Sequence, residues 1–442
     1  MRAPRLGGTD EAYLLLECTV GIVAPMQVVV VLDDDPGPAV ARDLVARLAG
    51  GPLDRAVRRP VVPGARPRWV RPPGAAQARV DPTPVDDAIA WARRHLGEAP
   101  LDVLGARGWQ VATVALTDGG RAVSVVASHV LADGRRFVET VADAVVGESC
   151  GDADPVPEGT PRPLRRVAGD AADAATAVAD AVRAAVHLVR GRAPDTPTSP
   201  PRRPAARSEE PASTPVDDAP THHVVTLDRA RWHAVAADLG GTATTLLVAL
   251  GAGLARHSGV VTARGGPQSP VRLTLAVDRR ADAHSSTANA ADGVAIALPT
   301  DPTPDTGLAA ARAAIRTALS DPPGDDALAR VARLLPSSTL AHVIAAIPGP
   351  DVAVSQLGPA PEGLLAWRGT RARTVLVRAA ARTAAPDLAR RMLPGIAVWA
   401  VEHDDAITVS VCAVDPVARA DLGGAVAREL DLWGLRADVR AG

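Results

Sequence analysis

The apolar positions in the N-terminal third of the chain follow two different periods. Three runs dense in β-branched residues, Met26–Leu32, Val111–Leu116 and Arg121–Ser128, predict strands in the interior of a sheet. Apolar residues at helical spacing predict helices over Pro84–Arg94 and Arg136–Val146. This part of the chain therefore combines strands with helices.

The same alternation returns after residue 220. The apolar segment Thr244–His257 predicts a helix, for which Thr242 or Thr244 is the expected N-cap. The expected strands of this half are Val224–Leu227, Val271–Val277, Gly293–Leu298, Val352–Ser355, Ile396–Val401 and Ala406–Val411.

The two halves are separated by a segment of different composition. Asp170–Arg190 is rich in alanine, with apolar residues at helical spacing, and predicts a helix. Residues 193–220 contain eight prolines among polar residues, which predicts an extended, mobile linker. The expected organisation is an N-terminal domain at 1–165, a helix and linker at 166–222, and a C-terminal domain at 223–442. Each domain mixes strands and helices, so the predicted fold class is α/β or α+β.

The composition excludes several classes of function. The 442 residues are 47% hydrophobic and 22% charged, as in globular proteins, and the formal net charge is −2. With nine aromatic residues and no excess of positive charge, nucleic acid is not an expected partner. All 48 basic residues are arginine, so a Schiff-base lysine, a pyridoxal-phosphate anchor and a P-loop lysine are excluded.

The cysteines and the apolar runs indicate whether metal sites, disulfides or membrane spans are expected. Cys18, Cys150 and Cys412 lie far apart, so neither a zinc site nor a disulfide framework is expected, and reduced thiols suit the cytoplasm. The N-terminus lacks the features of a signal peptide. The most apolar run, Val20–Leu32, has 13 residues, so no membrane span is predicted.

The segment 128–134, with the sequence SHVLADG, is the best candidate for chemistry. A strand brings His129 to its end, and Asp133 and Gly134 turn the chain into the next helix. An imidazole at that position is suited to act as a general base, and Gly134 permits positive φ or a close approach. The alternative is a loop histidine that only hydrogen-bonds locally.

Five segments, in order along the chain, resemble a known superfamily. It is the condensation-domain/acyltransferase superfamily that includes chloramphenicol acetyltransferase, and the resemblance is closest to its bacterial wax ester synthase/diacylglycerol acyltransferase-like branch. The family motif is HHxxxDG after a strand, so Ser128 replaces the first histidine. Gln356 replaces the usual asparagine of a later SNxxG segment. The five similar segments are 5–17, 128–134, 277–280, 289–299 and 354–358.

The resemblance implies a fold, a reaction and roles for these residues. Two chloramphenicol-acetyltransferase-like domains would form a V with the site in a channel between them. An acyl group would pass from a thioester, such as acyl-CoA, to an acceptor hydroxyl, with His129 as general base and no further cofactor. Asp133 would be structural, paired with Arg280 or, as second choice, Arg279. The remaining site candidates implied in this way are Asn289, Ser355 and Gln356, the last two near a site for the oxyanion.

Two other functions remain open at this point. One is transfer from a substrate tethered to an acyl carrier protein, with an ester or amide product, as in condensation domains of natural-product biosynthesis. The other is a catalytically inactive binding protein. Both retain the same motifs, and the sequence does not reveal the acyl chain, the acceptor or the oligomeric state.

Three further motifs favour structural interpretations. Residues 147–151 match GxSxG, but a helix precedes them instead of the strand that a nucleophile elbow requires. His222 and His223 have no further ligand at metal-binding spacing. Gly251 and Gly253 fall inside a predicted helix, which does not suit a dinucleotide-binding loop.

Residues 368–391 contain seven arginines and one acidic residue, Asp387. Such an excess suits the phosphates of an acyl donor or the acidic surface of a carrier protein. The alternative is a solvated face in an arginine-rich protein.

Overall fold

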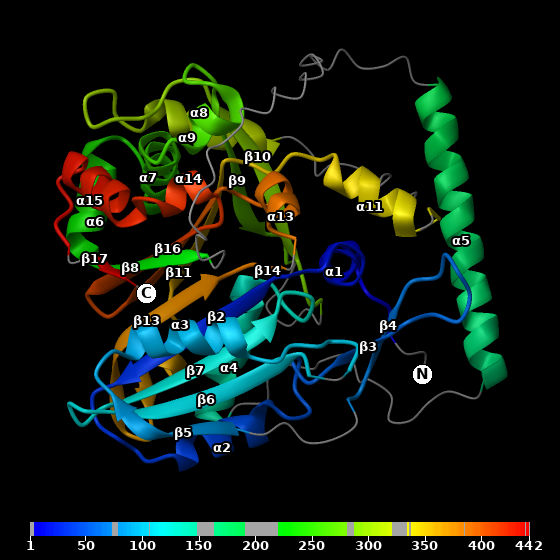
Figure 1. Cartoon of the computed structure of the whole chain (residues 1–442), viewed down its shortest axis with the longest axis horizontal. Coiled ribbons are helices and arrows are strands. Elements are labelled where there is room, and N and C mark those ends of the chain that lie inside the picture. The colour runs from blue at the N-terminus through cyan, green and yellow to red at the C-terminus, as the bar shows by residue number, and fades with distance from the viewer. Residues whose placement is uncertain are drawn as a thin grey trace, which may run out of the picture.

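The computed structural model describes residues 4–72, 78–105, 107–147, 163–190, 220–280, 287–320, 334–335, 337–383, 385–437 and 439–441. Two sheets dominate the described chain, one in each of two lobes (Figure 1). A smaller pair of strands, β1 (Ile22–Val23) and β14 (Arg382–Thr383), joins residues from the two halves of the chain. The mixed, two-lobed fold class predicted from the sequence is confirmed.

The N-terminal lobe is built on a six-stranded sheet. Its strands pair antiparallel except for β5 (Ala78–Val85) and β6 (Trp109–Leu116), which are parallel. Helices pack on both faces of this sheet: α2 (Ala39–Leu48), α3 (Ala88–Glu98) and α4 (Gly134–Val146). The strand order is β12 (Ala366–Trp367), β13 (Thr370–Ala379), β2 (Pro25–Leu32), β7 (Arg121–Ser128), β6 (Trp109–Leu116) and β5 (Ala78–Val85).

The burial of β2 shows how the helices cover both faces. Every residue of this strand is buried. Val28 and Val30 belong to the core that contains α2 and α4, whereas Val29 and Val31 belong to the core that contains α3. Successive side chains point to opposite faces of a strand, so a continuous apolar run fits a sheet covered on both sides.

The C-terminal lobe is built on a seven-stranded sheet covered by helices. Several of these helices share one hydrophobic core with the sheet, among them α6 (Arg229–Asp238), α7 (Ala243–His257) and α15 (Leu422–Leu432). The Thr242 side chain caps α7, as one of the two expected N-caps. The strand order is β10 (Ala291–Leu298), β9 (Val271–Asp278), β11 (Val352–Pro359), β15 (Ile396–His403), β16 (Ala406–Ala413), β8 (Thr221–Asp228) and β17 (Val439–Ala441).

The two lobes pack directly against each other through β15 and β16. Val398 and Ala400 of β15 face the core of the C-terminal lobe, whereas Trp399 and Val401 belong to the core of the N-terminal lobe. The Ser410 hydroxyl of β16 donates a hydrogen bond of 2.7 Å to the Val377 carbonyl of β13. The interface between the lobes is therefore part of the hydrophobic core.

Strand β13 belongs to the N-terminal sheet, whereas the sequence predicts its residues in the C-terminal domain 223–442. Although it lies far into the C-terminal half, it pairs antiparallel with β2 in the N-terminal sheet, with Val375 opposite Val30 (Figure 1). The segment 223–442 is therefore not one continuous structural unit. Pairing β13 with β2 covers an edge of the N-terminal sheet and ties the lobes together.

Two of the predicted helices have different starting points in the structure. The helix expected over Pro84–Arg94 begins at Ala88, because Pro84 and Val85 belong to β5 and the Asp87 carboxylate accepts from two N–H groups of the first turn. The helix expected from Asp170 begins at Pro163 and ends at Arg190 as α5. Of the predicted linker, residues 193–219 lie outside the described residues.

Helix α5 lies at one side of the molecule, away from both sheets (Figure 1). Its Asp170 carboxylate forms ion pairs with Arg5, at 3.0 Å, and Arg68, at 2.5 Å. Asp173 of the next turn forms ion pairs with Arg5 and Arg66. These contacts attach α5 to the small hairpin of β3 (Ala56–Arg58) and β4 (Arg68–Val70) and to the segment that follows β3.

Within the described residues, no individual helix combines the length and apolar character that crossing a bilayer requires. One sharply bent pair, α6 with α7, meets that criterion by length and composition.

Candidate active site

His129 follows the last residue of β7 and begins the loop that leads into α4. Its backbone N–H donates to the Ala24 carbonyl at 3.0 Å, just before β2. Val130, Leu131 and Ala132, which come next, are completely buried. The imidazole is therefore presented at the end of a central strand by a loop packed into the core.

Asn289 holds the imidazole from the C-terminal lobe. Its Nδ2 donates to three acceptors, namely Asp10 Oδ1 at 2.9 Å, the His129 carbonyl at 2.9 Å and the Val130 carbonyl at 3.2 Å. These acceptors identify Oδ1 as the amide atom that faces His129 Nδ1, at 3.2 Å. Because an amide oxygen only accepts, Nδ1 carries the proton and Nε2 carries the lone pair of the neutral ring.

Asp133 links the His129 loop to the same segment of the C-terminal lobe. Its carboxylate accepts hydrogen bonds from Arg280 Nη2 at 2.7 Å and Nη1 at 3.3 Å. It also accepts a hydrogen bond from the Ala290 N–H at 2.8 Å. It caps α4 by accepting from the Arg136 N–H at 2.9 Å. The Asp133 backbone N–H donates to the Ala288 carbonyl. Asp133 is therefore an N-cap and an ion-pair partner at once.

The structure distinguishes the two arginines that the sequence left as candidates for this contact. Arg280 reaches Asp133, and both side chains are almost fully buried. Arg279 turns to the other side of the chain and pairs with Asp292 at 3.4 Å, where both side chains are partly exposed.

Gly134 permits a close approach between the lobes. A Cβ at this position would lie 2.5 Å from Cζ3 of Trp399 and 3.4 Å from Cδ2 of Leu357. The φ angle of Gly134 is not positive, so the residue does not need the left-handed conformation that favours glycine. Of the two possible reasons for a glycine here, close approach to a neighbouring side chain is therefore the one that applies.

The surroundings of His129 favour the neutral ring. Burial lowers the pKa of His129 below 6.5, and this effect outweighs hydrogen bonds to backbone groups, the negative charge of Asp133 and the contact with Asn289. The imidazole is therefore neutral at pH 7 and able to accept a proton at Nε2.

Three residues of the N-terminal segment contact the His129 loop or Asn289, and the sequence assigned no role to any of them. Asp10 and Tyr13 come from α1 (Gly8–Leu15), and Glu17 comes from η1 (Leu16–Val20). The Ser128 hydroxyl donates to Glu17 Oε1 at 2.5 Å. The similarity of residues 5–17 to a family motif was the available signal, but spacing alone does not show what such a motif touches.

Ser355 and Gln356 lie on β11, just before Leu357. The contact of Leu357 with Gly134 brings the end of this strand against the His129 loop. Ser355 is buried, and Oε1 of Gln356 is a buried acceptor without a hydrogen-bond partner in the described structure. The role of either residue at an oxyanion remains a prediction.

Gly147 and the histidine pair occupy structural positions. Gly147 ends α4 with positive φ, and the rest of the GxSxG match lies outside the described residues. His222 is buried on β8, with Nε2 3.7 Å from Sγ of Cys412 on β16. No group of three or more metal-binding side chains occurs in the part of the chain that the structure describes.

The two glycines of α7 accommodate neighbouring side chains. A Cβ on Gly251 would press on Val352 and Val354 of β11. A Cβ on Gly253 would lie 2.2 Å from Oε1 of Glu429, a buried acid that accepts from Nε1 of Trp433. Helix packing explains this pair of glycines.

The seven arginines of 368–391 do not form one surface, which corrects both interpretations of the cluster. Arg378 is 1% exposed and donates to Gln27 Oε1 at 2.7 Å, and burial lowers its pKa to about 10. Arg371 pairs with Asp404 at 2.8 Å, and Arg373 pairs with Asp118 at 2.6 Å. Arg368 pairs with Asp43, and Arg382 donates to the carbonyls of Gly97 and Ala99. The last two arginines, Arg390 and Arg391, lie at the end of α13 (Pro386–Met392).

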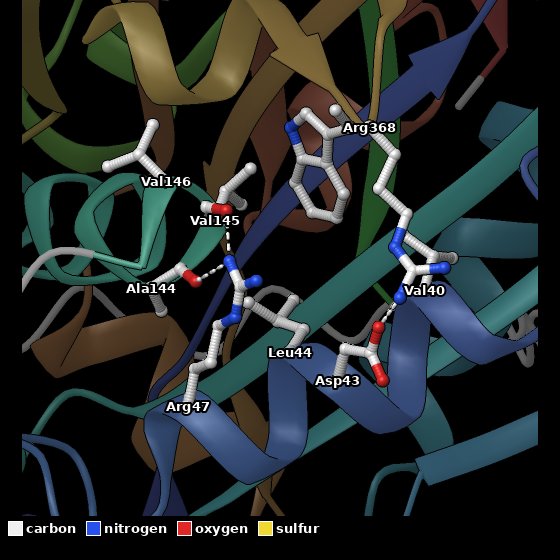
Figure 2. A pocket seen from close by; sticks show the side chains of 9 residues that line it. Val40, Asp43, Leu44, Arg47, Ala144, Val145, Val146 and Arg368 are labelled. Carbon is white, nitrogen blue, oxygen red and sulfur yellow. Dashed lines mark hydrogen bonds and ion pairs between the residues drawn. The ribbon is translucent and has the colours of Figure 1, made fainter.

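A pocket of about 200 Å³ lies at the C-terminal end of α4, the end opposite His129. Figure 2 shows the side chains that line it. Both of its guanidinium groups are engaged within the protein, Arg368 by Asp43 and Arg47 by the carbonyls of Ala144 and Val145. None of the predicted site residues lines it. Its lining is Val40, Asp43, Leu44, Arg47, Ala144, Val145, Val146, Trp367 and Arg368.

Comparisons with known proteins relate this architecture to solved structures. No protein-family model matches the sequence, and no curated protein shows a significant match. The wax ester synthase/diacylglycerol acyltransferase from Marinobacter aquaeolei VT8 superposes with a TM-score of 0.55 at 16% identity, over 97% of this chain and 98% of that chain.

Two other solved structures are similar to the same extent. The first condensation domain of the CDA synthetase gives a TM-score of 0.52 at 16% identity, over 93% of this chain and 90% of that one. Polyketide synthase associated protein 5 from Mycobacterium tuberculosis gives 0.55 at 15% identity, over 97% of each chain. The chain therefore has the two-lobed fold shared by condensation domains and the wax ester synthase/diacylglycerol acyltransferase.

Proposed function

We propose that the protein is an acyltransferase that moves an acyl group from a thioester to an acceptor hydroxyl, with His129 as general base. The observation that carries this proposal is the state of the imidazole between the lobes. Asn289 Oδ1 accepts a hydrogen bond from the Nδ1–H group, which leaves the lone pair on Nε2, and burial keeps the ring neutral. The fold shared with an acyltransferase supports the same reaction class.

In the proposed reaction, His129 Nε2 removes the proton of the acceptor hydroxyl as its oxygen attacks the thioester carbonyl carbon. The C–S bond of the resulting tetrahedral intermediate then breaks. The departing thiolate receives the proton from the imidazolium, which returns His129 to its neutral form. Ester and thiol are the products, and no other cofactor is required. Both substrates would reach Nε2 through a channel between the lobes.

Asp133 and Arg280 act on structure in this mechanism. Their ion pair, with the hydrogen bond from the Ala290 N–H, fixes the His129 loop relative to the segment that carries Asn289. The loop and the amide that orients the ring come from different lobes, so their relative position must be held for the base to be aligned.

A carrier-bound donor is the second candidate. The condensation domain of the CDA synthetase has nearly the same TM-score as the wax ester synthase, so the fold does not separate free acyl-CoA from a tethered acyl group. The arginines at 371 and 373 are already paired with acids on this chain, so they do not favour either donor.

The decisive experiment compares wild-type protein with the His129→Gln variant, using acyl-CoA and a carrier protein loaded with the same acyl group as alternative donors to a long-chain alcohol. Loss of a general base lowers kcat by about 10²–10⁴-fold, and we expect a loss in that range. The wild-type rate should rise with pH and reach a plateau, with an apparent pKa below 6.5, since only the neutral ring accepts a proton.

Arg279→Met is the matched control, because this side chain is partly exposed and does not touch the His129 loop. It should keep the wild-type rate. A His129→Gln protein that retains more than about a tenth of that rate contradicts His129 as base. A wild-type protein that transfers from neither donor contradicts acyl transfer from thioesters and favours the inactive binding protein.

A further inference from the structure

One face of the N-terminal helical segment is directed at the His129 loop. Asp10, Tyr13 and Glu17 are spaced by three and four residues, so they lie on the same side of α1 and its continuation η1. Each contacts a different part of the loop or of the residue that holds it. Helix α1 lies between the two lobes (Figure 1), where such contacts reach both.

Tyr13 contacts the reactive ring itself. Its ring lies parallel to the imidazole of His129, with centroids 3.9 Å apart and an interplanar angle of 13°. One face of the imidazole is therefore covered at van der Waals distance, and the ring edge with its nitrogens stays clear of the stack. Burial and the nearby charge of Asp133 raise the pKa of Tyr13 to about 12, so the stacked phenol is neutral at ordinary pH.

Asp10 acts on the same ring through Asn289. It is 3% exposed, and its Oδ1 accepts from both the N–H and the Nδ2 of Asn289, at 3.1 and 2.9 Å. Its Oδ2 accepts from the Gly7 N–H at 2.8 Å, which holds the carboxylate at the start of α1. These bonds orient the amide so that Oδ1 of Asn289, and not Nδ2, faces the Nδ1 atom of His129.

Glu17 fixes the backbone from which the imidazole extends. Its carboxylate accepts a hydrogen bond from the hydroxyl of Ser128, which is completely buried and directly precedes His129. Ser128 Oγ also accepts from the Val130 N–H at 3.2 Å, so the serine links Glu17 to the residue on the other side of His129. A hydroxyl therefore maintains the connection at the position where the family motif has a histidine.

We propose that Asp10, Tyr13 and Glu17 form a positioning face that sets the ring plane and tautomer of His129, and that Tyr13 is its principal member. Tyr13 restricts the ring plane, Asp10 restricts the proton position through Asn289, and Glu17 restricts the adjoining backbone. A base confined in this way keeps Nε2 aligned with the reacting hydroxyl without an entropic cost at each turnover. The catalytic consequence rests on the proposed acyl transfer, but the positioning itself does not.

The test compares Tyr13→Leu, which removes the ring, with Tyr13→Phe, which keeps it. Protein labelled with ¹³C and ¹⁵N in histidine gives the ring resonances and the tautomer of His129, assigned by their loss in His129→Gln. A ring stacked at 3.9 Å shifts those protons upfield by its ring current. We expect that shift in wild type and Tyr13→Phe, and its loss in Tyr13→Leu together with a mixture of tautomers.

Transfer kinetics provide the second readout. We expect kcat of Tyr13→Leu to fall by about tenfold to a hundredfold with a smaller change in KM, since misalignment of a base affects the chemical step. Tyr13→Phe should keep the wild-type kcat, because it retains the stacked ring. If the reaction required the phenol hydroxyl of Tyr13, this variant would lose activity.

The two proposals fail in different ways. An upfield shift and a single tautomer, in a protein without transfer activity, contradict the proposed function and leave the positioning face intact. Unshifted His129 resonances in wild type overturn the positioning face, and this measurement needs no variant at position 13. Wild-type kcat in a folded Tyr13→Leu protein also overturns it.

Discussion

Asp133 and Arg280 form the most completely buried ion pair between the His129 loop and the C-terminal lobe. Their side chains are 1% and 4% exposed. A buried charge that loses its partner is far more costly than a surface charge, because neither water nor a counter-ion replaces the lost interaction. The pair therefore couples the stability of the protein to the position of its candidate base.

A double-mutant cycle with Asp133→Asn and Arg280→Met tests this coupling. In Asp133→Asn the amide oxygen can still accept from the Arg136 N–H at the α4 N-cap, whereas the NH2 group cannot accept from the Ala290 N–H. The substitution therefore removes the charge and one hydrogen bond. We expect Arg280→Met to lose about 3–5 kcal/mol of unfolding free energy, since it leaves the buried Asp133 carboxylate without a cation. Asp133→Asn should lose less, because Arg280 keeps its ion pair with Asp278 at 3.2 Å. The double variant should lose less than the sum of the two.

Urea unfolding measures all four proteins, and Arg279→Met serves as the control for a partly exposed neighbour, with an expected change within about 0.5 kcal/mol. Strict additivity of the two single losses would contradict the coupling.

At the scale of elements, α5 has an inverted distribution of polar and apolar residues. The side that faces the protein carries Asp170 and Asp173 with small alanines, whereas Leu164, Val178 and Val182 are exposed. Over residues 163–183, where the structure describes the side chains, charge pairing and not burial of large apolar side chains therefore attaches this helix. Attachment of this kind depends on pH.

Acid should release α5 through these two aspartates. Burial alone would raise the pKa of Asp170, but the Val61 N–H and the guanidinium groups of Arg68 and Arg5 outweigh it and hold the pKa below 3.8. The pKa of Asp173 is lowered in the same way, mainly through Arg66. The pKa of each aspartate is lower in the folded protein than in the unfolded chain. The ion pairs of Asp170 and Asp173 therefore stabilise the fold fully above about pH 4, and this contribution disappears as the pH falls through the native pKa values.

We expect Asp170→Asn to lower the unfolding free energy at pH 7 by about 2 kcal/mol, the typical contribution of hydrogen bonds to a charged group. The difference from wild type should shrink as the pH falls below 3.8. Unfolding in urea at a series of pH values measures both effects. A difference that stays constant down to about pH 2 would show that the Asp170 charge does not stabilise the fold.

At the scale of the whole molecule, the lobes meet with little free space at Gly134. Trp399 of β15 approaches this residue so closely that a methyl group there would overlap its indole ring. The indole belongs to the core of the N-terminal lobe although its strand belongs to the other sheet. The helix that follows His129 is thus packed against a strand from the opposite lobe.

Gly134→Ala should therefore separate the lobes locally. We expect a loss of about 1–3 kcal/mol, as for other insertions into well-packed cores, with a fall in kcat because the His129 loop shifts. A second substitution, Trp399→Leu, removes the overlapping atoms, so the double variant should be more stable than the two losses added together. Melting temperatures and kcat of the four proteins provide the measurement. An unchanged melting temperature of Gly134→Ala would contradict the contact.

The local pattern of the sequence determined much of the secondary structure. Arg121–Ser128 is a strand with the predicted bounds, because its dense β-branched residues suit a strand covered on both faces. The helix expected from Pro84 starts four residues late because tertiary pairing of β5 with β6 extends that strand through Val85. Element boundaries depend on such pairing, which no local window contains.

The candidate site was determined in part by the sequence. His129 and Asp133 stand at a strand end and a helix start, so their local motif places both in one loop. Arg280 is more than 140 residues away, and only the folded chain shows that it, and not Arg279, contacts Asp133. The sequence suggested the contact through family resemblance and left the choice between the two arginines open.

What only the tertiary structure decided is the set of contacts made between distant segments. The arginines of 368–391 are contiguous in the sequence, yet β13 runs through the N-terminal sheet and buries Arg378 while leaving Arg371 exposed. Tyr13 and Asn289 contact His129, and Asp10 contacts Asn289, because the N-terminal helix and the segment before β10 converge between the lobes. Periodicity reports which face of an element is buried, but which elements share that burial is settled by packing of the whole chain.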